Sequence, residues 1–131
     1  MLNLNSAIVV VETDEGIRSL LSTILRLSNY QVLSFTDGDE ALDDLRQNPC
    51  RVNLLITDIF LGPSLDGLEL AEDMRLLYPN LKTLFLSGRN DRIELKEEIE
   101  SGRAWFLGKP FKPSQLTQKI ETILSEALTP I

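Results

Sequence analysis

Apolar residues follow two different patterns that alternate along the chain. Residues 7–11 form a continuous apolar run rich in valine, which is typical of a strand buried on both faces. After this run, apolar residues recur every three or four positions, as on one face of a helix. These helical positions are Ile17, Leu20, Leu21, Ile24 and Leu25. The first stretch therefore predicts a strand followed by a helix.

The same alternation continues to the end of the chain. Further strands are predicted over residues 31–35, 52–57, 83–86 and 104–107. Further helices are predicted around residues 41–45, 68–77, 93–99 and 114–127, the last begun by Pro113. Five strands that are each followed by a helix imply a parallel sheet with helices on both faces. The predicted fold class is a doubly wound α/β sandwich, for which the flavodoxin-like strand order 2-1-3-4-5 is favoured.

Polar residues mark where the first two helices begin. The carboxylate of Asp14 is placed to accept a hydrogen bond from the first turn of the first helix. For the second helix, Thr36, Asp37 and Asp39 are alternative capping residues. Prolines 49 and 79 end the second and third helices, because the residue before a proline disfavours helical geometry.

Length and composition fit one folded domain. Of the 131 residues, 43% are hydrophobic and 25% are charged, which is enough apolar material for a single core. We expect one domain over residues 1–131 with its core at about 7–127. After the last predicted helix only residues 129–131 remain, so no output domain is expected in this chain.

Charge and cysteine content narrow the expected partners and location. The net charge of -7 repels nucleic acid backbones and anionic lipid surfaces, so no direct binding to nucleic acid or membrane is expected. No apolar run approaches the length of a membrane span. The single cysteine, Cys50, has no partner for a disulfide, which favours a reducing cytoplasm.

The residues available for chemistry are limited. The chain contains no histidine, which removes histidine-based nucleophilic catalysis and the usual general base of hydrolases. It also lacks the G-x-x-x-x-G-K-[ST] motif, which excludes a P-loop nucleotide-binding site. Carboxylates, hydroxyl groups and lysines must therefore carry any reaction.

Such residues follow four of the predicted strands. In a parallel sheet, ligands bind outside the carboxyl ends of the strands, so these residues are expected to converge on one edge. Taken alone, an aspartate after a strand is more often a helix cap or a turn former. An acidic cluster would repel itself unless a lysine or a divalent cation lay within it, and Mg²⁺ suits oxygen ligands. The converging residues are Glu12, Thr13, Asp14, Asp58, Ser87 and Lys109.

Four separated motifs resemble those of the receiver domains of response regulators. The likeness extends from Ile8 to about Ala127, and its motifs lie in order at the predicted strand ends. The motifs are Val9-Val10-Val11-Glu12 with Ile17-Arg18, Leu55-Ile56-Thr57-Asp58-Ile59 with Asp66-Gly67-Leu68-Glu69-Leu70, Leu84-Phe85-Leu86-Ser87, and Phe106-Leu107-Gly108-Lys109-Pro110-Phe111.

The resemblance implies a phosphoacceptor rather than an enzyme, with at most self-catalysed phosphorylation and dephosphorylation. Asp58 would take a phosphoryl group from the phosphohistidine of a sensor histidine kinase or a phosphotransfer protein. Mg²⁺ would be held by Glu12, Asp58 and the backbone carbonyl of Phe60, with Thr13 or Asp14 as a further candidate ligand. Because phosphoryl transfer needs alignment and charge neutralisation, Mg²⁺ and Lys109 would supply positive charge.

The resemblance also implies how the signal would leave the site. The hydroxyl group of Ser87 would donate to a phosphoryl oxygen, and Phe106 matches the aromatic residue that turns inward behind this movement. A proline directly after Lys109 suits a cis peptide bond, which is uncommon on sequence alone and which only the resemblance makes a stronger expectation. The output face would comprise the fourth helix, fifth strand and fifth helix, and it would contact an effector protein or a second copy of the chain. Trp105 is equally compatible with a core or a surface position.

The sequence departs from the family pattern at two places. Where the family has a second acid after the first strand, this chain has Thr13, which costs the metal site one negative charge. Asp14 either compensates for this loss or caps the next helix, and the cap is the favoured interpretation. The loop over residues 58–67 is one residue longer than the common form, but the extra length follows Phe60 and need not move its carbonyl.

Two other functions were compared with this one. A degenerate receiver would serve as a phosphorylation-independent docking or dimerisation module; Thr13 supports this alternative, whereas Asp58, Ser87 and Lys109 oppose it. A Mg²⁺-dependent phosphatase with an aspartyl nucleophile would need a second aspartate two residues after the first. Phe60 occupies that position, which argues against a phosphatase.

Overall fold

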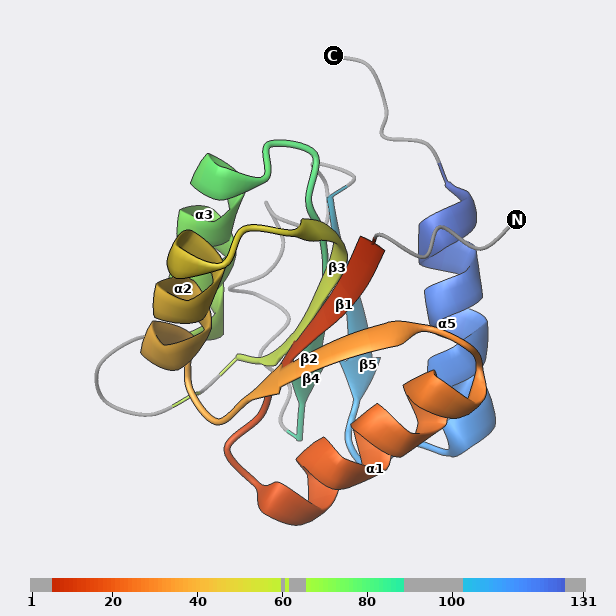
Figure 1. Cartoon of the computed structure of the whole chain (residues 1–131). Helices are drawn as coiled ribbons and strands as arrows, with labels where there is room; N and C mark the ends of the chain where they lie inside the picture. The colour runs from red at the N-terminus through yellow and green to blue at the C-terminus, as the bar shows by residue number, and fades with distance from the viewer. Residues whose placement is uncertain (1–5, 60, 62–65, 89–102, 127–131) are drawn as a thin grey trace.

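A five-stranded parallel sheet runs through the middle of the molecule (Figure 1). The computed structural model describes residues 6–59, 61, 66–88 and 103–126. Its strand order is β2-β1-β3-β4-β5, which confirms the predicted flavodoxin-like arrangement. The strands are β1 (Ser6–Val11), β2 (Gln31–Phe35), β3 (Arg51–Asp58), β4 (Lys82–Ser87) and β5 (Ala104–Gly108).

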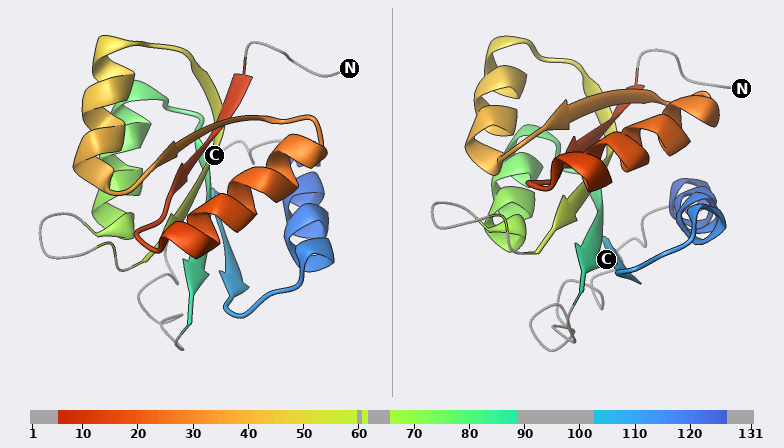
Figure 2. Two further views of the ribbon diagram at one scale, coloured as in Figure 1. Left: turned by 60° about the horizontal axis from the view of Figure 1, so that its bottom comes forward. Right: turned by 90° about the horizontal axis from the view of Figure 1, so that it is seen from below.

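Helices cover both faces of this sheet, so the doubly wound class is also confirmed. One face is covered by α1 (Glu15–Leu27) and α5 (Pro113–Ser125), and the other by α2 (Gly38–Gln47) and α3 (Gly67–Leu77), as the view from below in Figure 2 shows. The helix predicted at residues 93–99 lies outside the described residues. None of the helices in the described part of the chain is long and apolar enough to cross a membrane.

Burial on both faces explains why β1 is apolar throughout. Successive side chains of a strand point to opposite faces of the sheet. Val9 and Val11 accordingly belong to the core beneath α2 and α3. Ile8 and Val10 belong to the core beneath α1 and α5. The two cores hold β1 as an inner strand between β2 and β3, and this fixes the position of the residue that follows it, Glu12.

Three aspartates cap helices at the same edge of the sheet. Asp14 Oδ1 accepts a hydrogen bond from the Ile17 N–H at 2.9 Å. The second helix is capped by Asp37, which accepts from Glu40 N–H at 2.8 Å, so Asp37 is the capping residue among the three candidates. Asp66 caps α3 in the same way. Because β1 and β3 are neighbours in the sheet, their carboxyl ends lie side by side.

Candidate functional site

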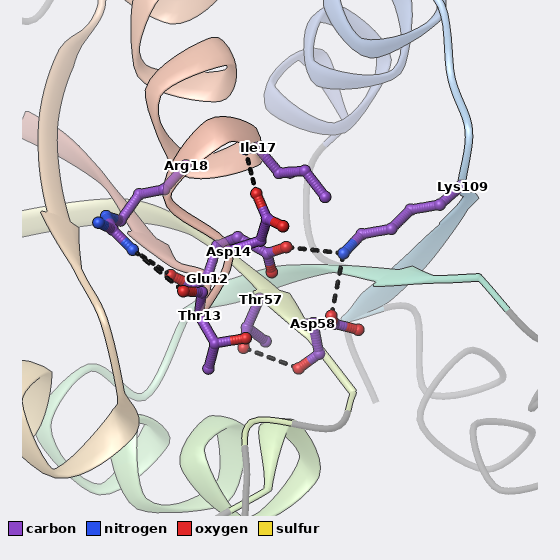
Figure 3. Close-up of polar contacts among 8 residues, drawn as sticks. All are labelled: Glu12, Thr13, Asp14, Ile17, Arg18, Thr57, Asp58 and Lys109. Carbon is purple, nitrogen blue, oxygen red and sulfur yellow. Dashed lines mark hydrogen bonds and ion pairs between the residues drawn. The ribbon is translucent and has the colours of Figure 1, made fainter.

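One lysine joins two carboxylates at the carboxyl edge of the sheet. Glu12 follows β1, Asp58 ends β3 and Lys109 follows β5. Lys109 Nζ lies 2.8 Å from Glu12 Oε1 and 2.9 Å from Asp58 Oδ2, and Figure 3 shows it between the two side chains. The structure thus brings together three residues that the sequence placed at different strand ends.

The three charged groups differ in exposure, and the pKa values of Glu12 and Lys109 are raised for different reasons. The Glu12 side chain is only 1% exposed, whereas Asp58 and Lys109 keep 19% and 17% of their surface. Burial raises the pKa of Glu12 above its ordinary value, although Lys109 partly offsets this effect. Burial disfavours the charged form of Lys109, but hydrogen bonds with Glu12 and Asp58 outweigh burial and raise its pKa. Lys109 is therefore cationic at neutral pH.

The two carboxylate oxygens of Glu12 differ in their hydrogen bonding. Its Oε1 accepts from Lys109, but Oε2 has no partner among the residues that the structure describes. A buried carboxylate oxygen without a partner costs free energy that a hydrogen-bond donor or a cation would recover. Together with Asp58, this oxygen provides the hard donors that Mg²⁺ prefers while it keeps several waters. The site therefore fits a magnesium ion with two carboxylate ligands.

A third carboxylate does not join them. Within residues 6–59, 61, 66–88 and 103–126, no three acidic, histidine or cysteine side chains are grouped closely enough to hold a metal ion. Thr13 and Asp14 are both exposed, and the Asp14 carboxylate is bound to the first turn of α1. The interpretation of Asp14 as a helix cap is confirmed. Phe60, whose carbonyl was predicted to bind the metal, lies outside the described residues.

The remaining predicted residues lie on β4 and β5. Ser87 ends β4 and is 3% exposed, and its carbonyl accepts a hydrogen bond from the Lys109 N–H at 2.8 Å. Phe106 is half-buried and packs against the core beneath α2 and α3. Trp105 packs partly against the opposite core, so it is neither fully buried nor a free surface residue. The peptide bond between Lys109 and Pro110 is cis, the form to which only the resemblance pointed.

Gly67 allows α3 to lie close to the end of β3, a role that the sequence did not reveal. A Cβ atom at Gly67 would collide with the carbonyl oxygen of Asp58. The Gly67 N–H also donates to the carbonyl of Ile59 at 2.7 Å. Asp66-Gly67 belongs to one of the four sequence motifs, but only the folded backbone shows why Gly67 has no side chain. Gly67 thus sets how closely α3 approaches the end of β3.

Comparison with known proteins identifies the family. The model of the response regulator receiver domain matches residues 8–121. The chain belongs to the response regulator receiver family. Receiver domains are regulatory phosphoacceptors of two-component systems, and they generally bind Mg²⁺ at their acidic pocket.

Two curated relatives illustrate how much of a protein such a receiver occupies. The chain is 31% identical over 124 residues to the alkaline phosphatase synthesis transcriptional regulatory protein PhoP of Bacillus subtilis, and the match covers 92% of this chain and 49% of PhoP. It is 34% identical over 121 residues to the response regulator receiver protein CpdR of Brucella abortus, covering 92% of this chain and 98% of CpdR. The chain thus spans about half the length of PhoP and nearly all of CpdR.

A solved structure shows the same architecture. The receiver domain of NtrX from Brucella abortus superposes with a TM-score of 0.80 at 30% identity, covering 92% of this chain and 99% of that one. The receiver fold and its family are therefore established for this chain, while the roles of its individual site residues are proposals.

Proposed function

We propose that Asp58 accepts a phosphoryl group from the phosphohistidine of a sensor histidine kinase or a phosphotransfer protein. The observation that carries this proposal is the contact of Asp58 Oδ2 with Lys109 Nζ at 2.9 Å, while 19% of the Asp58 side chain stays exposed. A donor can reach such a carboxylate, and a fixed cation already lies beside it. The chain has no histidine, so the phosphohistidine must lie outside these 131 residues.

The transfer exchanges one bond to phosphorus for another. A carboxylate oxygen of Asp58 forms the new P–O bond while the P–N bond of the donor breaks, and the electron pair leaves with the imidazole nitrogen. Because the transition state is loose, positioning and charge neutralisation contribute more than covalent assistance. Lys109 holds its ammonium group 2.9 Å from the acceptor carboxylate, where it can neutralise charge on the incoming phosphoryl oxygens.

Glu12 and Asp58 are the residues proposed to hold Mg²⁺, with the carbonyl of Phe60 as a third ligand. The buried Glu12 Oε2, which has no hydrogen-bond partner in the described part of the chain, supports this assignment. When bound, the ion would neutralise charge on the phosphoryl oxygens. Thr13 offers only a neutral hydroxyl group, and Asp14 is occupied as the cap of α1. We therefore propose a weaker magnesium site than one with two acids after β1.

Ser87 and Phe106 are proposed to carry the signal from the site to β5 and α5. Ser87 lies at the same edge of the sheet as Asp58, because Asp58 pairs with Leu86 and Ser87 is the next residue of β4. Phe106 pairs with Phe85 on the neighbouring strand, one step from this edge. The proposed output face comprises β5, α5 and residues 91–101, of which the last lie outside the described residues. An effector protein or a second copy of the chain would bind there.

Amide chemical shifts would test this route to the output face. Activation with beryllofluoride and Mg²⁺ should shift amide resonances of β5 and α5 as well as those near Asp58, since a population shift changes every element that differs between the two states. Changes confined to the surroundings of Asp58 would refute the coupling through Ser87 and Phe106. The same experiment on Asp58→Asn should show no activation.

A degenerate receiver that acts as a docking or dimerisation module is the second candidate. The observation that favours it is the lack of a third acidic side chain near Glu12 and Asp58 among the described residues. Binding of beryllofluoride separates the two functions, because this phosphoryl mimic needs both Asp58 and a bound cation. A wild-type protein that gives no spectral change at saturating Mg²⁺ would favour the docking module.

The proposed compartment and the proposed type of partner are inferred from net charge and from the single cysteine. The net charge of -7 argues against direct nucleic acid binding, so output is proposed to pass through protein contacts. Cys50 is a free and exposed thiol, and we propose a reducing cytoplasm as the location, where such a thiol is kept reduced.

A further inference from the structure

Arg18 reaches back from the first turns of α1 to the turn that carries Glu12. Its Nη1 donates a hydrogen bond to the Glu12 carbonyl oxygen at 2.8 Å and lies 3.5 Å from the Thr13 carbonyl oxygen. Figure 3 shows the guanidinium group beside these two backbone positions. Arg18 thus contacts the backbone of Glu12 and Thr13 in the turn after β1, and the direction of the Glu12 side chain depends on this backbone.

The peptide groups on both sides of Glu12 are held in place. On one side, the Glu12 N–H donates to the Phe35 carbonyl at 3.2 Å. Val11 is the last residue of β1 that pairs with a neighbouring strand, so the peptide group after Glu12 has left the sheet. Arg18 gives that peptide group a donor in place of a strand partner. Two fixed peptide planes determine where the Cα–Cβ bond of Glu12 points.

Arg18 is itself anchored in the helix. Its N–H donates to the Asp14 carbonyl at 2.9 Å, and its carbonyl accepts from the buried Ser22 hydroxyl group at 2.9 Å. A side chain that starts from a regular and packed helix loses less freedom when it binds than one that starts from a loop. The contact therefore ties the turn after β1 to the body of α1.

We propose that Arg18 is a positioning residue that aims the Glu12 carboxylate at the cation site. The inference rests on the proposed function in so far as that site holds Mg²⁺. In this chain Thr13 carries no charge and the Asp14 carboxylate is engaged as a helix cap. Glu12 is thus the acid after β1 that contacts Lys109, and its direction matters more than in a receiver with two acids available.

An effect of charge and an effect of positioning would change the Mg²⁺ affinity in opposite directions when Arg18 is lost. If Arg18 acted only as a nearby cation, its removal would relieve repulsion and tighten Mg²⁺ binding. If it positions Glu12, its removal releases the turn and weakens Mg²⁺ binding. Groups that orient metal ligands typically change metal affinity by roughly tenfold or more when they are removed. The sign of the change therefore separates the two roles.

The test uses three variants of the full chain. Arg18→Met removes the charge and both hydrogen bonds while it keeps a long side chain. Arg18→Lys keeps the charge but loses the planar group that reaches both carbonyls. Arg26→Met removes an exposed arginine from the last turn of the same helix and serves as the matched control. Urea denaturation first establishes that each variant is folded at the assay temperature.

Two measurements are made on each variant. In the metal-free protein, the side-chain carboxyl ¹³C resonance of Glu12 reports its surroundings directly. We expect it to move in Arg18→Met and to move less in Arg18→Lys, while Arg26→Met leaves it unchanged. In a Mg²⁺ titration followed by Trp105 fluorescence, Arg18→Met should raise the midpoint roughly tenfold, with Arg18→Lys between it and the wild type.

The outcomes distinguish this inference from the proposed function. A wild-type protein that does not respond to Mg²⁺ would remove the proposed cofactor, but the Glu12 resonance would still decide whether Arg18 positions that carboxylate. An unchanged Glu12 resonance in Arg18→Met would overturn the inference whether or not Mg²⁺ binds. A lower Mg²⁺ midpoint in Arg18→Met would also overturn it, because that result is expected of a charge alone.

Discussion

Two lysines lie at opposite edges of the sheet and meet different partners. Lys109 follows β5 at the carboxyl edge, where it binds the carboxylates of Glu12 and Asp58. Lys82 begins β4 at the amino edge. Lys82 Nζ donates to the Ile123 carbonyl at 2.7 Å and to the Glu126 carbonyl. One lysine is thus paired with charges, and the other with backbone dipoles at the end of α5.

The difference in partners decides the direction of each pKa shift. Burial lowers the pKa of Lys82, and the attraction of Glu126 does not reverse this effect. Burial also disfavours charge on Lys109, but its two carboxylate partners raise its pKa above the ordinary value. The carboxyl edge therefore holds a lysine paired with two carboxylates, whereas at the amino edge a lysine binds the backbone at the end of a helix.

The largest expected effect separates the two lysines by activity. Lys109→Met removes the ammonium group beside Asp58, and the rate of phosphorylation by acetyl phosphate should fall by roughly a hundredfold, the typical loss for one electrostatic contact to developing charge. Lys82→Met is the matched control and should leave the rate nearly unchanged. Rates are obtained from intact mass at a series of times. Similar losses in the two variants would contradict the division between the edges.

The next effect concerns the charge that Thr13 does not supply. Thr13→Asp adds a carboxylate near the cation site and should tighten Mg²⁺ binding by about 1 to 3 kcal/mol through Coulomb attraction. Asp14→Asn should leave the Mg²⁺ midpoint unchanged, because asparagine caps a helix as well as aspartate does. Titration followed by Trp105 fluorescence compares both variants with the wild type. Equal midpoints for wild type and Thr13→Asp would show that this substitution does not limit metal binding.

A smaller effect should appear in the stability of the metal-free protein. Because burial raises the pKa of Glu12, its ionised form costs stability at neutral pH, and this cost disappears as the pH falls below the ordinary value of 4.5. Glu12→Gln removes the charge at every pH and should raise the free energy of unfolding at neutral pH. Urea denaturation should show the advantage shrinking in acid. If Glu12→Gln were less stable than wild type at neutral pH, the ionised form of Glu12 would not cost stability.

The smallest effect is a difference of slopes at alkaline pH. The raised pKa of Lys109 means that its stabilising contribution is complete below the ordinary value of 10.5 and is lost as the pH rises through the folded-state value. The lowered pKa of Lys82 means that its charged form costs stability, and this cost disappears as the pH rises towards 10.5. Relative to Lys109→Met, wild type should lose stability with rising pH; relative to Lys82→Met, it should gain. If the stability difference from both variants changed in the same direction with pH, the type of partner would not determine the direction of the two pKa shifts.

Most of the fold could be predicted because its elements carry strong periodic patterns. Residues 31–35 were predicted as a strand and form β2 with the same bounds. The third strand was predicted at 52–57 but extends to Arg51 and Asp58, because backbone pairing continues through polar residues that an apolar pattern does not include. The second helix likewise begins at Gly38, before the apolar positions that indicated it.

The site could be predicted only as far as strand ends determine it. The topology of a parallel sheet brings Glu12, Asp58 and Lys109 to one edge, and the structure confirms their contact. The contacts of Arg18 with the Glu12 carbonyl and of Lys82 with the Ile123 carbonyl could not be predicted. Both end on backbone oxygens, which every residue possesses, so no residue type signals them in a sequence.

Intact mass spectrometry tests the central claim most directly. Wild-type protein, Asp58→Asn and the matched control Asp66→Asn are incubated with acetyl phosphate and Mg²⁺; Asp66 is the helix cap of α3, a role that asparagine can retain. Wild type and Asp66→Asn should each gain the mass of one phosphoryl group, and this gain should disappear when Mg²⁺ is chelated. Asp58→Asn should gain nothing. A wild-type protein without the mass increment at high Mg²⁺, or an Asp58→Asn protein that still acquires it, would contradict the assignment of Asp58 as the phosphoacceptor.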